Sequence, residues 1–187
     1  MTELLQLLRS TRWLTATAVL LLAVQLFGNL YEQLVPNVGL IADPRPSSVV
    51  GELEPGSPVF YYLPWAPLGV ALVVVLAIRL QRRGPNWVTR RMWSAVACLA
   101  VAVLAKVVLI TQVNPLFRDT TAAVETVRTY AIGWAVGNGI TILAVAAALL
   151  LLTTWRAHVL DRAVAEGADA APTGNLAVPA TSAVAPR

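Results

Sequence analysis

Cysteine, histidine and charged residues are all scarce in this sequence, and each shortage excludes a class of protein. Cys98 is the only cysteine, so no internal disulfide can form. His158 is the only histidine and no acidic cluster accompanies it, which argues against haem held by two histidines, di-iron sites and zinc sites. Only 13% of the 187 residues are charged, while 57% are apolar and the mean hydropathy is +0.68. We therefore expect an integral membrane protein without a metal or other cofactor.

The basic residues are placed as in a membrane protein. Lysine and arginine number 14 against ten acidic residues, and the arginines gather at the ends of apolar runs. Five of them lie in one short connection, at Arg79, Arg82, Arg83, Arg90 and Arg91. The positive-inside rule places this connection in the cytoplasm. This pattern orients a chain in the lipid bilayer and does not indicate a nucleic-acid partner.

Four apolar runs predict four transmembrane helices, at about residues 13–35, 62–80, 92–113 and 129–155. Pro36 is expected to end the first of them. The short connections predict an antiparallel four-helix bundle with both termini in the cytoplasm. We thus expect an all-α, multi-pass protein of the cell membrane with one transmembrane domain over residues 1–165. The Ala-, Pro- and Thr-rich residues 166–187 predict a disordered tail.

The only lysine, Lys106, lies inside the third apolar run and requires a partner. An ammonium group at bilayer depth costs at least about 2.5–3.5 kcal/mol, so such a residue suggests a function. At about 1.5 Å per residue, Lys106 lies roughly 12 Å below Asn114, and Glu32 lies roughly 6 Å below Pro36. A lysine side chain can bridge these depths. Glu32 is therefore the predicted partner of Lys106.

Other polar and aromatic residues lie in the same outer half of the predicted bundle. Spacings of three and four residues place them along one face of the first and fourth helices, which predicts a cavity that opens outward. Two simpler explanations stay open: hydrogen bonds between helices, and an aromatic belt at the membrane surface before the second helix. The predicted substrate-binding residues are Gln25, Asn29, Tyr31, Tyr61, Tyr62, Trp65, Asn114, Arg128, Tyr130, Trp134 and Asn138.

Glu32 and Lys106 together suggest acid–base chemistry. In a pocket of low dielectric constant a carboxylate and an amine can share or exchange a proton. Tyrosines and amides beside them could stabilise the negative charge of an enolate or phenolate. The sequence contains no Gly-rich phosphate loop, no CxxC motif and no Ser-His-Asp set to suggest other chemistry.

Three segments resemble a known family: Gly28–Pro36, Val113–Leu116 and Trp134–Asn138. Over roughly residues 13–155 the chain resembles small four-span membrane proteins related to anthrone oxygenases. The resemblance implies oxidation of polycyclic anthrones to anthraquinones without metal or flavin, and it implies pocket roles for Asn114, Trp134 and Asn138. The chain departs from the family pattern after Asn138, where Gly139, Ile140 and Thr141 stand in place of an arginine.

The sequence thus favours a small membrane enzyme, with Glu32 and Lys106 as the catalytic pair. Its expected substrate is hydrophobic, like a polyketide or terpenoid, and its reaction a cofactor-free oxygenation, cyclisation or isomerisation. The alternative is a non-catalytic membrane subunit or lipid-binding protein whose polar stripes pack helices together. In both cases the surroundings are the lipid bilayer, and association of several copies is compatible with the sequence.

Overall fold

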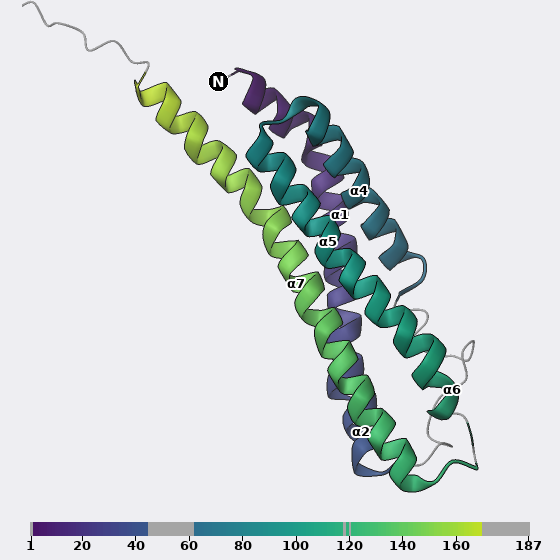
Figure 1. Cartoon of the computed structure of the whole chain (residues 1–187). Coiled ribbons are helices and arrows are strands. Elements are labelled where there is room, and N and C mark those ends of the chain that lie inside the picture. The colour runs from purple at the N-terminus through teal and green to yellow at the C-terminus, as the bar shows by residue number, and fades with distance from the viewer. Residues whose placement is uncertain (1, 45–61, 118, 120, 170–187) are drawn as a thin grey trace, which may run out of the picture.

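Long helices account for the regular structure throughout the part of the chain that the computed structural model describes, residues 2–44, 62–117, 119 and 121–169 (Figure 1). Four of these helical stretches are long and apolar enough to cross a membrane, which indicates a multi-pass membrane protein. The elements are α1 (Thr2–Leu34), α2 (Pro36–Ala42), α4 (Trp65–Arg83), α5 (Asn86–Val108), η2 (Leu109–Val113), α6 (Asn114–Phe117) and α7 (Val124–Asp169).

The helices extend beyond the apolar runs that predict them. α1 begins at Thr2 and α7 continues to Asp169, so the polar residues 166–169 are helical where the sequence predicts the start of a tail. Hydropathy marks the part of a helix that suits the bilayer, whereas the helix itself continues while its backbone hydrogen bonds are met. Residues 170–187, the rest of the predicted tail, lie outside the described residues.

Pro36 interrupts the first helix but does not end the helical path. α1 ends at Leu34, as the position of Pro36 predicts, but the chain does not enter a loop directly, because α2 starts at Pro36 and runs to Ala42. Proline has no N–H to donate, yet the first position of a helix needs none. The N–H of Gly39 donates to the carbonyl of Val35 over 3.1 Å, which resumes the helical pattern.

The four long helices pack side by side and form a closed ring. α1 packs on α4 and α7, and α5 packs on α4 and α7. α1 and α5 therefore face each other across the interior. Toward one end the interior is filled by apolar side chains from all four helices, such as Leu22, Val73, Leu99 and Leu152. A second apolar cluster, around Leu40, Val113 and Val127, closes the other end between α2, η2, α6 and α7.

Gly69 marks a close contact between α1 and α4, and Gly84 follows the last residue of α4. A Cβ atom on Gly69 would lie 3.1 Å from Leu22, and one on Gly84 would lie 3.7 Å from Leu7. The same atom on Gly84 would lie only 2.8 Å from the carbonyl oxygen of Leu80, so no larger residue fits this helix end without a shift. Consequently the tight turn between α4 and α5 depends on glycine.

α5 widens into a π-helical turn, η2, shortly after Lys106. Across it the N–H of Asn114 donates to the carbonyl of Leu109, five residues earlier. In a regular α-helix, Lys106 and Asn114 would point about 80° apart, since successive residues turn by about 100°. The π turn accommodates one extra residue, which reduces this angle to about 20°. As a result Lys106 and Asn114 face the same neighbour, α7.

Candidate functional site

Lys106 and Glu32 form a direct ion pair between α5 and α1. The lysine Nζ lies 2.7 Å from the glutamate Oε2, and the two side chains are only 14% and 5% exposed. α1 and α5 face each other across the bundle, so the long lysine side chain crosses the interior to reach its partner. The structure thus places Lys106 and Glu32 in contact, as their similar predicted depths in the membrane suggest.

Two aromatic rings flank the ammonium group of Lys106. Its Nζ lies 4.7 Å from the ring centre of Tyr62 and 4.8 Å from that of Trp134. Both are within the range of a cation–π interaction, which is strongest away from water. The indole N–H of Trp134 donates to Asn114 Oδ1 over 3.2 Å and so fixes the orientation of its ring.

The hydroxyl group of Tyr62 links the ion pair to the amides of α1. It accepts a hydrogen bond from Lys106 Nζ over 3.4 Å and donates to Asn29 Oδ1 over 3.3 Å. Asn29 in turn donates to the carbonyl of Gln25, one turn earlier in α1, over 2.8 Å. Tyr62 lies just before α4, so one phenol connects three parts of the chain.

Asn138 joins α7 to this network. Its Nδ2 donates to the backbone carbonyl of Asn29 over 2.9 Å and to Gln33 Oε1 over 3.1 Å. Its Oδ1 is buried and has no hydrogen-bond partner among the described residues, and the same is true of Gln25 Oε1. An unpaired buried acceptor is costly, so these two oxygens are suited to accept a hydrogen bond from a hydroxyl group or water.

Most of the predicted site residues gather in this network, and four of the others lie elsewhere. Arg128 pairs with Glu125 over 3.0 Å at the surface. Tyr130 is 39% exposed because it precedes the fully buried Ala131 and so points about 100° away from the packed face. Trp65 and Tyr31 are 43% and 49% exposed. Tyr61 lies outside the described residues.

Gln33 belongs to the network although the sequence analysis does not single it out. It lies four residues after Asn29, on nearly the same face of α1, and it accepts the hydrogen bond from Asn138. The spacing of four residues therefore indicates that Gln33 lies on the face of α1 that carries Asn29. A carboxylate in an apolar helix is more unusual than an amide, so the neighbouring Glu32 is the stronger candidate from the sequence.

The members of the network bind one another directly. A hollow of about 350 Å³ lies on the outer side of α1, lined by Val24, Phe27, Gly28 and Tyr31, and it does not include the ion pair. No three His, Cys, Asp or Glu side chains of the described residues are close enough to hold a metal ion. The groups of the site that can take part in a reaction are therefore its carboxylate, its ammonium group and its phenol.

No family model, curated protein or solved structure matches the chain. The resemblance to proteins related to anthrone oxygenases thus stays a prediction from three sequence segments. The function is therefore inferred from the described side chains.

Proposed function

We propose that this protein is a small membrane enzyme in which Glu32, Lys106 and Tyr62 transfer protons on a hydrophobic substrate. The observation that carries the proposal is the ion pair itself, which is 2.7 Å long and almost fully buried inside the bundle. A buried pair stabilises a fold no better than well-packed apolar side chains of similar volume. Its presence is therefore better explained by chemistry that needs both charges.

In the proposed reaction Glu32 is the base. Its carboxylate takes a proton from an acidic C–H or phenolic O–H of the substrate. Lys106 and the hydroxyl of Tyr62 then stabilise the enolate or phenolate oxygen that forms. In an isomerisation or cyclisation the Glu32 carboxyl group returns the proton to another carbon, so no oxidant is needed. In an oxygenation, molecular oxygen adds to the enolate carbon and the resulting peroxide takes the proton back from Glu32. Removal of the second proton from that carbon then breaks the O–O bond, which leaves a carbonyl group and releases water.

The unpaired acceptors would orient the substrate. Gln25 Oε1 and Asn138 Oδ1 are buried on α1 and α7, and each can accept a hydrogen bond from a substrate hydroxyl. A polycyclic or terpenoid substrate with an oxygen function suits this combination of apolar walls and few polar groups.

The proposed topology is an antiparallel bundle with both termini in the cytoplasm. It is supported by the order of contacts between α1 and α4, where Gly69 faces Leu22 and Gly84 faces Leu7, so residue numbers rise along one helix as they fall along the other. It is also supported by the arginines between α4 and α5. The proposed site then lies in the half of the membrane away from the cytoplasm.

Tyr62→Phe is the sharpest test of catalysis, because it removes only the hydroxyl and keeps the ring over Lys106. Extracts of cells that produce the wild type would be compared with those of cells producing the variant, to find metabolites that depend on the protein. We expect their formation to fall about 100-fold or more. Thr111→Val is the matched control, since it removes an exposed hydroxyl that bonds only within its own helix and to Gln112.

A second candidate is a non-catalytic clamp that ties the helices together. The observation that favours it is the direct contact of Lys106 with Glu32, in which each charge already has its partner on another helix. The two candidates differ in the behaviour of Tyr62→Phe and Glu32→Gln. If both variants are stably folded in the membrane and the metabolites are unchanged, the enzyme proposal is wrong and the clamp is favoured.

A further inference from the structure

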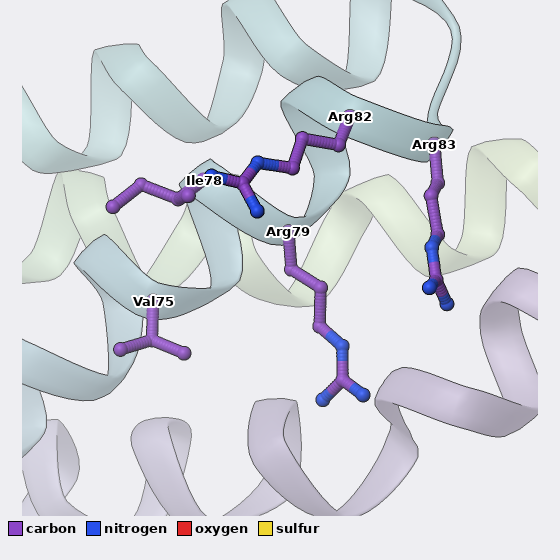
Figure 2. A pocket seen from close by; sticks show the side chains of 5 residues that line it. All are labelled: Val75, Ile78, Arg79, Arg82 and Arg83. Atoms are coloured by element: carbon purple, nitrogen blue, oxygen red, sulfur yellow. The ribbon is translucent and has the colours of Figure 1, made fainter.

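A row of exposed residues on α4 combines basic and apolar side chains. Val75, Ile78, Arg79 and Arg82 follow spacings of three, one and three residues, which place them on one face of the helix. With Arg83 they line an open hollow of about 330 Å³. Figure 2 shows the side chains of Arg79 and Arg83 extending from the same side of α4, while that of Arg82 extends back along the helix on the side of Ile78.

The three arginines of this hollow do not pair with any other part of the described chain. Among the described residues, none of their guanidinium groups makes a hydrogen bond or ion pair, and the sequence of α4 contains no Asp or Glu. Guanidinium groups bind phosphate through paired N–H donors in a fixed geometry. The hollow is therefore lined by three arginines whose phosphate-binding groups are not used within the described chain.

The order of residues along α4 matches the shape of a lipid. α4 has 19 residues, a length of about 28 Å, which just spans the hydrocarbon layer of about 30 Å. Arg82 and Arg83 end the helix and so lie at headgroup level, whereas Val75 lies about 10 Å deeper, beside the acyl chains. A free phosphate ion would use only the arginines. A phospholipid would use the whole row.

We propose that the hollow formed by Val75, Ile78, Arg79, Arg82 and Arg83 binds one anionic phospholipid, with its phosphate on the arginines and an acyl chain along Val75 and Ile78. Basic side chains at a membrane surface attract anionic lipids. This site is at the opposite end of α4 from Tyr62 and does not depend on the proposed catalytic function.

Native mass spectrometry of the full chain tests this proposal. The protein would be released from detergent with an equimolar mixture of phosphatidylglycerol and phosphatidylcholine of the same acyl chains. We expect the wild type to retain one phosphatidylglycerol. The triple variant Arg79→Gln/Arg82→Gln/Arg83→Gln should lose this preference about 100-fold, and Arg82→Gln alone about fivefold, as expected for one basic group near an anionic surface.

A triple variant of equal charge is the control. Arg9→Gln/Arg12→Gln/Arg90→Gln removes three other exposed arginines and should retain the lipid as the wild type does. Equal loss in both triple variants would mean a diffuse attraction to positive charge and would overturn the proposal. So would full displacement of the lipid by millimolar inorganic phosphate, because the site would then hold a free anion and not a lipid.

Discussion

At the scale of single residues, the Lys106 ammonium group is held by four groups at once. Glu32 provides the opposite charge, Tyr62 a hydroxyl and a ring, and Trp134 a second ring. Removing one member of a buried ion pair leaves the other charge without a partner in a medium of low dielectric constant. The stability of the bundle should therefore respond more strongly to single changes of the pair than to a joint change.

Lys106→Met should lower the free energy of unfolding by about 3–5 kcal/mol, because Glu32 remains buried without a cation. Adding Glu32→Gln to this variant should recover a large part of the loss. Unfolding of the purified protein in mixed micelles, followed by circular dichroism, measures both values. If the double variant were as unstable as the sum of the single ones, the two side chains would not be energetically coupled.

Sequence alone predicts the pair, because the cost of a lysine in an apolar run demands a partner and helix geometry limits the choice to residues of similar depth. It does not predict which tyrosine joins the pair. Tyr62, just before α4, contacts Lys106, whereas Tyr130, in the second turn of α7, is exposed. Which face a helix buries depends on the neighbour opposite, and a periodic pattern tolerates errors of one residue.

At the scale of elements, the π turn η2 sets the direction in which the side chains after it point. The extra residue keeps Asn114 on the face of Lys106, where both contact Trp134. The pattern of apolar residues does not predict this turn. The sequence of Leu109–Val113, three apolar and two polar residues, is compatible with a regular α-helix. The predicted helix over 92–113 lies within a longer helical stretch, Asn86–Phe117, and the prediction misses this local geometry.

Deleting Thr111 should be tolerated, because it removes the extra residue and converts η2 into a regular helix with Lys106 and Asn114 still about 20° apart. Deleting Ala100 from α5 is the matched control, since this residue is also exposed. That deletion turns Lys106 by about 100° away from Glu32 and should cost about 3 kcal/mol or more. Comparable unfolding curves for the two deletions would contradict this role of the π turn.

Gly137 allows η2 and α7 to pack closely. A Cβ atom there would lie 2.8 Å from the Cδ2 atom of the buried Leu109. Gly137→Ala should therefore lower the free energy of unfolding by about 1–3 kcal/mol, the usual cost of overpacking. Gly133→Ala, where a Cβ atom meets nothing within 4 Å, should leave stability unchanged or raise it. Equal effects of the two changes would show that the contact does not matter.

At the scale of the whole molecule, the proposed topology places the α4–α5 connection and the start of α7 on opposite sides of the membrane. Hydropathy predicts the four spans because apolar length is set by the bilayer. It does not predict how the spans pair, since lipid-facing and helix-facing residues are equally apolar. The closed ring of helices and the position of α1 opposite α5 come from the structure alone.

Single cysteines test the topology. In a Cys98→Ala background, Asn86→Cys and Ala123→Cys each introduce one exposed thiol, at the two sides of the bundle. A thiol reagent that does not cross membranes should label the Ala123→Cys variant in intact cells and the Asn86→Cys variant only after the cells are opened. The reverse pattern would mean an inverted orientation, and labelling of both in intact cells would exclude the four-span arrangement.

α7 is long enough to act as a lever. Its 46 residues span about 69 Å, more than twice the thickness of the hydrocarbon layer, and in Figure 1 its last turns project beyond the other helices. Trp134 and Asn138, which contact the network around Lys106, lie near one end of this rod. From Trp134 to Asp169 the arm measures about 52 Å, so a tilt of about 10° at the site would displace its far end by about 9 Å.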